Sequence, residues 1–330
     1  MTGLPTLLSR RYRYIRLEWS SEFSLLRLRT CVKPIQCYSL AAMAELQQVF
    51  NDISANPGLV KHYVMTSDVA GVFNFGGDLS LFVLLIRARD LNSLRLYGRR
   101  CIDLVWWMET AAQRGVHTTV LVQGDTLGGG LESVLPFHRV IFERSAQAGF
   151  PEVLFNLFPG MGAWDFTIRK AGFAVANDMI LSGRLYTAEQ LHRRSLVDLV
   201  VEDGEGEEAI EQVVRSVHPR LRGTLAALQA RSLVAPITYE SLSARPAAAT
   251  KARSKRSSGS SSTPPGAKRE RGLRGGAKKD PGLPNGVACS NRGSRPAAGM
   301  TFRTAPPSPF SEGARGSSAL IGYSRPAITS

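Results

Sequence analysis

Residues 118–132 read TTVLVQGDTLGGGLE, and this stretch decides how the fold is interpreted. It begins with a β-branched, apolar run over 118–123, which is typical of a buried strand. A glycine cluster follows, and Glu132 stands directly behind it. Glycine lets the backbone approach a ligand closely, and a helix that begins there leaves N–H groups free to bind anionic oxygen. The pattern therefore predicts a strand–loop–helix unit that can hold a negative charge.

Three further segments extend this candidate site. NFGGDL (74–79) is a second glycine loop that opens a helix, with Asp78 as the expected N-cap. PEV (151–153) places Glu152 beside a turn, and FPGMG (158–162) is another glycine-bearing loop. Two glycine loops and two carboxylates together favour an oxyanion hole served by a pair of acids.

Outside these loops the hydrophobic pattern alternates between strands and helices. A hairpin is expected over 11–30, because alternating residues flank a Ser-Ser-Glu turn signal. Alternating strands and helices predict a layered α/β fold. We expect helices over 39–55, 79–90, 93–114, 163–183, 187–194 and 207–217, and short strands over 63–67, 118–123, 140–142 and 196–201.

The charge is concentrated at the C-terminal end. The chain has 330 residues and a net charge of +14, and residues 245–330 hold 16 Lys+Arg against 3 Asp+Glu. This segment has no apolar period, so it is predicted to be a disordered, basic tail. Because the apolar pattern is lost within a few residues, we also interpret the tail as the product of a frameshift. The predicted organisation is a flexible N-terminus (1–11), a catalytic domain (12–244) and the tail (245–330).

Several classes of function are disfavoured by composition. The four cysteines and five histidines form no metal-ligand pattern, so no metal and no other cofactor are expected. Neither a P-loop nor a dinucleotide-binding glycine motif occurs at the glycine cluster. With the excess charge confined to the tail, nucleic acid is not an expected partner. No apolar run is long enough for a membrane span or a signal-peptide core, which predicts a cytoplasmic protein.

The pattern FGGDL … GDTLGGGLE … PEV … FPGMGA … MILSGRLYTAEQL … LVD resembles the crotonase (enoyl-CoA hydratase/isomerase) superfamily over roughly residues 12–243. Within it, the chain is most similar to the diffusible signal factor synthases. The resemblance implies a crotonase-type ββα spiral fold. It implies that Glu132 and Glu152 are catalytic and that the backbone N–H groups of Phe75 and Gly129 form the oxyanion hole. The substrate-binding residues assigned with it are Gly76, Gly128, Leu131, Phe155, Gly160 and Met161.

The resemblance also implies an activity and its partners. The implied enzyme dehydrates a 3-hydroxyacyl group on acyl carrier protein and hydrolyses the thioester, which releases a cis-2-enoic acid for quorum sensing. The implied substrate is an acyl carrier protein or CoA thioester, the implied assembly is a homotrimer, and a regulatory sensor kinase is a further implied partner. Two alternatives stay open: a plain enoyl-CoA hydratase or isomerase, and an inactive, regulatory protein of the same fold. The abrupt change at residue 245 motivates the second alternative.

Overall fold

The structure is a computed structural model that describes residues 7–244. The tail over 245–330, with its predicted disorder and its interpretation as a frameshift product, lies outside the described residues. So do the first six residues of the N-terminal segment that was expected to be flexible. Everything that follows concerns residues 7–244.

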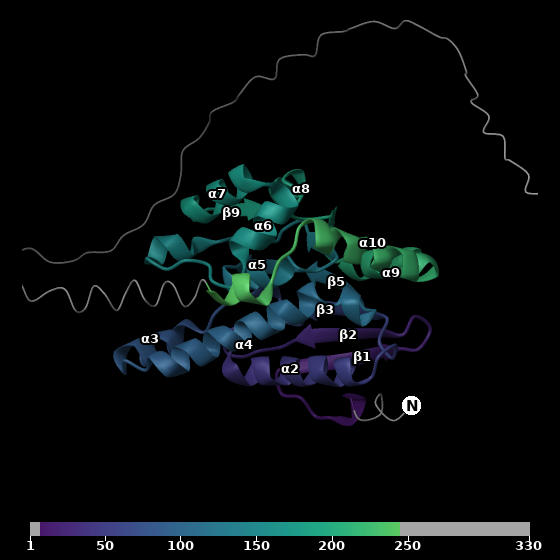
Figure 1. Cartoon of the computed structure of the whole chain (residues 1–330), viewed down its shortest axis with the longest axis horizontal. Coiled ribbons are helices and arrows are strands. Elements are labelled where there is room, and N and C mark those ends of the chain that lie inside the picture. The colour runs from purple at the N-terminus through teal and green to yellow at the C-terminus, as the bar shows by residue number, and fades with distance from the viewer. Residues whose placement is uncertain (1–6, 245–330) are drawn as a thin grey trace, which may run out of the picture. The chain divides into compact units, whose positions relative to one another are not determined.

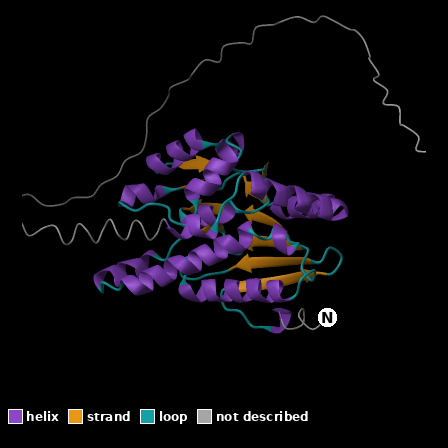
Figure 2. Ribbon diagram, viewed as in Figure 1, coloured by secondary structure: helices purple, strands orange, loops and turns teal. Residues whose placement is uncertain are grey.

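The larger of two sheets carries the hairpin and the longer strands (Figure 2). It is built from β1 (Ile15–Ser20), β2 (Leu25–Thr30), β3 (His62–Ser67), β5 (His117–Val122), β7 (Arg139–Glu143) and β10 (Leu199–Val201). The strand order is β1-β2-β3-β5-β7-β10. β1 and β2 pair antiparallel, as expected for the hairpin over 11–30, and the later neighbours pair in parallel.

The smaller sheet consists of very short strands. They are β4 (Gly71–Asn74), β6 (Gly124–Leu127), β8 (Gln147–Gly149) and β9 (Leu185–Thr187), in that order across the sheet. β4, β6 and β8 pair in parallel, and β9 pairs antiparallel to β8. None of the four was predicted, because three or four residues are too few to show an alternating pattern.

Successive turns of the chain add strands to the two sheets alternately. β3 is followed by β4, β5 by β6 and β7 by β8, so each turn adds one strand to each sheet before a helical segment returns the chain. This arrangement is the ββα spiral that the sequence resemblance implied, and the predicted α/β fold class is confirmed. Strands that are neighbours in the smaller sheet therefore come from consecutive turns.

Helices cover the sheets (Figure 1). They are α2 (Leu40–Ala55), α3 (Leu79–Arg87), α4 (Leu91–Glu109), α5 (Gly129–Val134), α6 (Ala163–Ala171), α7 (Phe173–Ser182), α8 (Ala188–Arg193), α9 (Gly206–Val217) and α10 (Leu221–Val234). Three short 3-10 segments, η1 (Ala112–Arg114), η2 (Pro151–Phe155) and η3 (His218–Arg220), link them. Ser39 and Asp78 cap α2 and α3 as the sequence indicated.

Two helical predictions were wrong in detail. The helix expected over 163–183 is broken at Gly172, whose φ of +83° ends α6 and starts α7. The amphipathic helix over 207–217 is not the last one, because α10 follows it. Only Leu225 of α10 is buried, so this helix has no apolar stripe by which it could have been recognised.

The core lies between the sheets and the first helices. Phe50 of α2 stacks on Trp107 of α4 with ring centroids 4.1 Å apart, and both rings contact Tyr63 of β3 edge-on.

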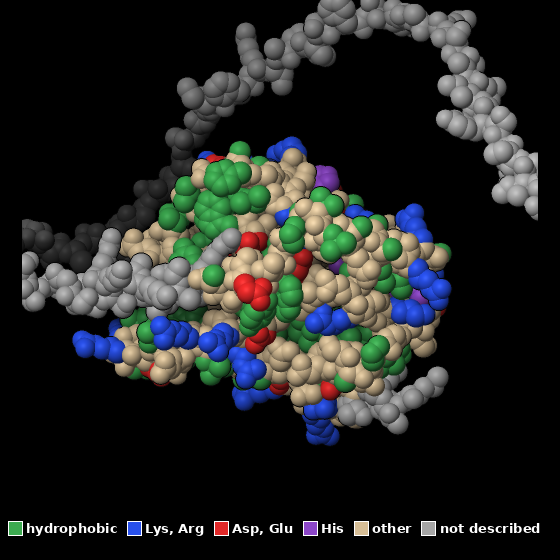
Figure 3. Space-filling view, viewed as in Figure 1, with side chains coloured by type: hydrophobic (Ala, Val, Ile, Leu, Met, Phe, Trp, Pro, Cys, Tyr) green, Lys and Arg blue, Asp and Glu red, His purple; other side chains and the backbone are tan. Residues whose placement is uncertain are grey.

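On the face seen in Figure 3, hydrophobic side chains gather over α7, where Phe173 is 65% exposed. Within residues 7–244 no helix is both long and apolar enough to cross a membrane.

Candidate active site

Two parallel strands deliver the two glycine loops to one place. β4 pairs with β6, and the last residues in register are Asn74 and Thr126. Each strand then runs into a glycine loop that opens a helix, α3 after β4 and α5 after β6. The loops touch backbone to backbone, since a Cβ built on Gly76 would lie 2.8 Å from the Gly129 nitrogen. Glycine is required at this contact because any side chain would separate the loops.

Glu132 lies inside the protein behind these loops. It belongs to α5 and is 1% exposed. One carboxylate oxygen accepts hydrogen bonds from the backbone N–H groups of Met161 at 2.6 Å and Ala163 at 2.9 Å. Burial and then the charge of Glu152 raise the pKa of Glu132, whereas the backbone hydrogen bonds oppose that rise. The fold therefore orients this carboxyl group while it favours the protonated form.

Glu152 faces the same glycine loop from η2. Its Oε1 atom lies 2.4 Å from the position that a Cβ of Gly128 would take, and its Oε2 atom is buried without a hydrogen-bond partner in residues 7–244. Burial raises the pKa of Glu152 as well. When two neighbouring carboxyl groups both resist ionisation, one can be protonated while the other is ionised near neutral pH. Such a pair supplies one acid and one base.

The N–H groups of the loops differ in whether they are already used. The Gly128 N–H donates to the Gly149 carbonyl at 2.8 Å, and the Gly76 N–H donates to the Asn74 side chain at 2.7 Å. Gly129 and Gly77 donate no backbone hydrogen bond to any residue in the described range. Both groups are therefore available to an anionic oxygen.

The sequence assigned the first of these donors to Phe75, and the structure does not support that assignment. The Phe75 N–H donates to the Gln36 carbonyl at 2.8 Å, so it is engaged within the fold. Gly77 stands two residues later, and its nitrogen lies 3.6 Å from the position that a Cβ of Gly129 would take. Gly77 is therefore a better candidate for this donor than Phe75. The motif could not reveal this, because the direction of a peptide group depends on its pairing partner.

The residues assigned to substrate binding are only partly brought together. Gly76 forms the loop contact with Gly129, and Gly128 lies beside Glu152. Gly160 precedes Met161, whose N–H donates to Glu132 and whose sulfur lies 2.9 Å from the Cβ position of Gly129. Leu131 is 1% exposed and belongs to the hydrophobic core. Phe155 is 67% exposed at the end of η2, and no contact places it at the glycine loops.

Sequence reasoning missed the residues that hold the loops in place. Tyr38 and Tyr97 are buried, and their hydroxyl groups bond to Ser133 and to the Tyr38 carbonyl at 2.6 and 2.5 Å. Ala163 at the start of α6 orients Glu132 through its backbone. A backbone donor leaves no side-chain signal in a sequence, and a buried tyrosine resembles any other core aromatic residue.

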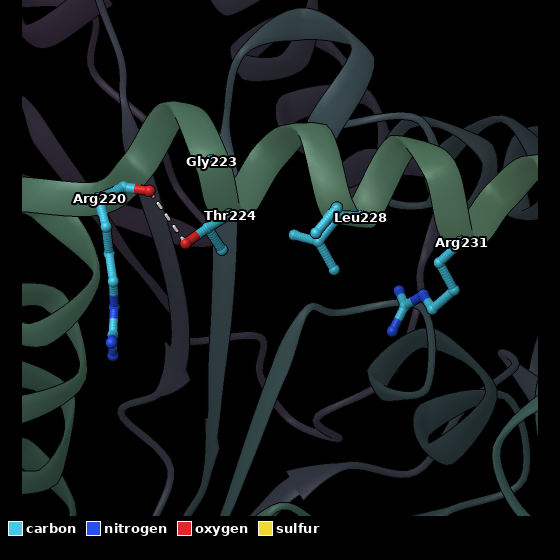
Figure 4. Close-up of a pocket in the computed structure, with 6 residues that line it drawn as sticks. Arg220, Gly223, Thr224, Leu228 and Arg231 are labelled. Carbon is cyan, nitrogen blue, oxygen red and sulfur yellow. Dashed lines mark hydrogen bonds between the residues drawn. The ribbon is translucent and has the colours of Figure 1, made fainter. Parts of the chain in front are cut away.

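A separate shallow pocket lies along α10 (Figure 4). Its volume is about 650 Å³, and Arg220 and Arg231 project from the same side of the helix toward it. It shares no residue with the glycine loops or the glutamates. Within residues 7–244 no group of three or more acidic, histidine or cysteine side chains could hold a metal ion.

Known proteins with related sequences support one family. The profile of the enoyl-CoA hydratase/isomerase family matches residues 33–254. The chain is 28% identical over 172 residues, 52% of its length, to the peroxisomal fatty acid beta-oxidation multifunctional protein AIM1 of Arabidopsis thaliana, and covers 23% of it. It is 26% identical over 200 residues, 60% of its length, to the human peroxisomal bifunctional enzyme, and covers 25% of it. The chain thus spans about a quarter of these relatives.

Solved structures share the fold at low sequence identity. The enoyl-CoA hydratase of Bacillus anthracis superposes with a TM-score of 0.61 at 20% identity, over 74% of this chain and 95% of the other. DspI of Pseudomonas aeruginosa superposes with a TM-score of 0.58 at 21% identity, over 76% of this chain and 90% of the other. The match to the family profile covers about two thirds of the 330 residues, and these two structures share the fold of this chain. The chain belongs to the enoyl-CoA hydratase/isomerase family.

Proposed function

We propose that this protein is a hydratase that adds water reversibly across the double bond of 2-enoyl thioesters, with enoyl-CoA as the substrate class. The observation that carries the proposal is that buried Glu132, in the helix that the glycine loop opens, and Glu152, beside Gly128 of that loop, lie close enough to influence each other's charge, next to a Gly129 N–H that has no partner within residues 7–244. Family membership and the relatives' names support the substrate class. This is the alternative that the sequence left open.

The geometry supports a division of roles. The thioester carbonyl oxygen would lie between the N–H groups of Gly77 and Gly129, which stabilise the negative charge that develops on it when the enolate forms. One glutamate, in its ionised form, takes a proton from water as the water oxygen bonds to C3 of the substrate. The other, in its protonated form, delivers a proton to C2. In the reverse direction the same groups remove water.

The test is a product assay with purified full-length chain. A 2-enoyl-CoA should lose the absorbance of its conjugated thioester, and mass spectrometry should find a product heavier by one water with the thioester intact. If enoyl-CoA substrates of short, medium and long chain all remain unchanged, the proposal fails. That outcome, combined with normal thermal unfolding, would favour the inactive, regulatory alternative.

A narrower activity is proposed from the phrases VFNFGGDLSLF, LVQGDTLGGGLE and PEVLFNLFPGMGA, which are similar to the diffusible signal factor synthases. In it, the same glutamates dehydrate a 3-hydroxyacyl group on acyl carrier protein, and one of them then activates water against the thioester. Release of a free thiol together with a cis-2-enoic acid would establish this activity. Dehydration with the thioester retained would reject it and leave the broader proposal intact.

Assembly and regulation complete the proposal. A homotrimer and a regulatory sensor kinase are expected from the sequence resemblance alone, and a cytoplasmic location is expected from the short apolar runs. Analytical ultracentrifugation of the full-length chain tests the first of these, because a trimer has three times the monomer mass of 35.9 kDa.

A further inference from the structure

The two N–H donors of the site come from loops that are far apart in the chain. Gly77 follows β4 and Gly129 follows β6, and α3 and α4 lie between them. An oxyanion hole works only when both donors point to one oxygen within hydrogen-bond tolerance, since the interaction weakens steeply with distance and angle. The fold therefore needs a device that sets one loop against the other.

Tyr38, just before α2, is connected by hydrogen bonds to both loops. Its backbone N–H donates to the Gly76 carbonyl at 2.8 Å, which fixes the first loop. Its hydroxyl group donates to Ser133 Oγ at 2.6 Å, and Ser133 follows Glu132 in α5. Ser133 Oγ then donates to the Gly130 carbonyl at 2.7 Å, which lies next to Gly129.

Tyr97 of α4 adds two hydrogen bonds on the side of the Gly76–Gly77 loop. Its hydroxyl group donates to the Tyr38 carbonyl at 2.5 Å and accepts the Asp78 N–H at 3.0 Å. Tyr38 and Tyr97 are each 3% exposed. The hydroxyl groups of Tyr97 and Ser133 each donate and accept, and that of Tyr38 donates, so each hydroxyl group of the network has a partner.

We propose that Tyr38 is a positioning residue that sets the Gly76–Gly77 loop against the Gly129 end of α5, through its backbone on one side and its hydroxyl group on the other. The inference rests on the proposed function, because it assigns the alignment of the same oxyanion hole. Burial raises the pKa of Tyr38, so the hydroxyl group stays protonated and keeps donating at any assay pH.

Tyr38→Phe removes the hydroxyl group and keeps both the ring and the backbone bond. We expect kcat for enoyl-CoA hydration to fall about tenfold, with KM within about twofold, because an alignment defect acts on the transition state. Ser133→Ala should produce the same loss. The double variant should be no worse than either single variant, since both changes break one connection.

Tyr63→Phe is the matched control. Tyr63 is also a fully buried tyrosine, but its hydroxyl group has no hydrogen-bond partner within residues 7–244. Removing that hydroxyl group should leave kcat within about twofold of wild type. Ser133→Thr retains a hydroxyl group at the second position and should retain most of kcat.

Amide hydrogen exchange on the same variants provides a readout that does not depend on turnover. Tyr38→Phe should speed exchange in residues 75–78 and 128–134, whereas Tyr63→Phe should not. Faster exchange in a chain without turnover would reject the proposed function and keep the structural connection. The inference is overturned if Tyr38→Phe matches Tyr63→Phe in kcat, if its exchange is unchanged, or if the two single losses multiply in the double variant.

Discussion

The glutamate pair, Glu132 and Glu152, can be compared with a second set of buried titratable groups, which lies where strands β3, β5 and β7 of the larger sheet begin. This histidine row consists of His62, His117 and His138, with neighbouring ring centroids 5.8 and 5.5 Å apart. Burial lowers the pKa of His62 to about 4 and that of His117 to about 3. Both sets therefore hold groups in their neutral forms inside the protein.

The surroundings of the two sets differ in one respect that matters for chemistry. The glutamate pair lies next to touching glycine loops, in which the N–H groups of Gly77 and Gly129 have no partner among the described residues. In the row, His138 Nδ1 accepts the Thr118 N–H at 3.0 Å and His62 Nε2 lies 3.1 Å from Nδ1 of His218, while Nδ1 of His62 and Nδ1 of His117 have no partner within residues 7–244. Neither a shifted pKa nor an unpaired buried atom alone marks an active site; the glutamate pair differs because it adjoins backbone N–H donors of two glycine loops.

The first prediction removes the acid–base function of Glu132, the more deeply buried glutamate of the pair. Glu132→Gln keeps the acceptor for Met161 and Ala163 but cannot exchange a proton, so kcat for hydration should fall about 10²–10⁴-fold. Steady-state kinetics at neutral pH measure this loss. Glu143→Gln is the control, because Glu143 is buried with a raised pKa but lies at the end of β7. Equal losses in both variants would remove the distinction drawn above.

The second prediction disturbs the loop rather than the acid. In Gly128→Ala the new methyl group would lie 2.4 Å from Glu152 Oε1, so the carboxylate must move and kcat should fall roughly 10²-fold. Gly58→Ala has the same kind of backbone strain, with φ at +80°, but its Cβ would meet no atom within 4 Å. It should lose stability and keep its kcat. Activity unchanged in Gly128→Ala would show that Glu152 is not held where the reaction occurs.

The third prediction concerns the histidine row and acid. A histidine whose pKa is lowered by folding stabilises the fold fully above its unfolded value of about 6.5, and that stability is lost as pH falls toward the folded value. Each buried histidine should therefore lower the free energy of unfolding by about 1.4 kcal/mol per pH unit below pH 6.5. Urea unfolding from pH 7 to pH 5 measures the slope, and His117→Asn should flatten it. A slope that His117→Asn leaves unchanged would contradict the burial of this residue as a neutral group.

The fourth prediction has the opposite sign and the smallest size. Glu132 has a raised pKa in the fold, so its contribution to stability is present below its unfolded value near 4.5 and is lost as pH rises through the folded value. Glu132→Gln should therefore gain stability over wild type as pH rises from 5 to 8, by about 1–2 kcal/mol. Thermal unfolding of both proteins across this range tests it. A difference in stability between the variant and wild type that does not shift in favour of the variant from pH 5 to pH 8 would refute it.

Much of the site could be predicted from the sequence because its signals are local. Strand, glycine cluster and Glu132 are contiguous, and glycine marks the close approach that the loops later show. The hairpin and the helix capped by Ser39 were also predicted, since alternation and helical spacing persist over many residues. Whether these residues catalyse a reaction stays a prediction.

What could not be predicted depends on contacts between distant segments. The Phe75 N–H is taken by Gln36, and no local pattern says which peptide group a neighbouring segment will bond. The second sheet is assembled from strands of three or four residues that gain stability only from one another. Leu131 was assigned to the substrate because of its place in a motif, although its side chain completes the core.

The spiral order of the strands has an evolutionary consequence. β4 and β6 pair directly, so the two loops that follow them meet whatever lies between them in the chain. Helix α3, residues 79–87, lies between the two loops in the chain and buries none of its residues. Its exposed side chains, among them Val83 and Leu84, can therefore change in evolution without disturbing the core or the pairing of β4 with β6. Helix α4 lacks this freedom, because Tyr97 bonds to Tyr38 and Asp78.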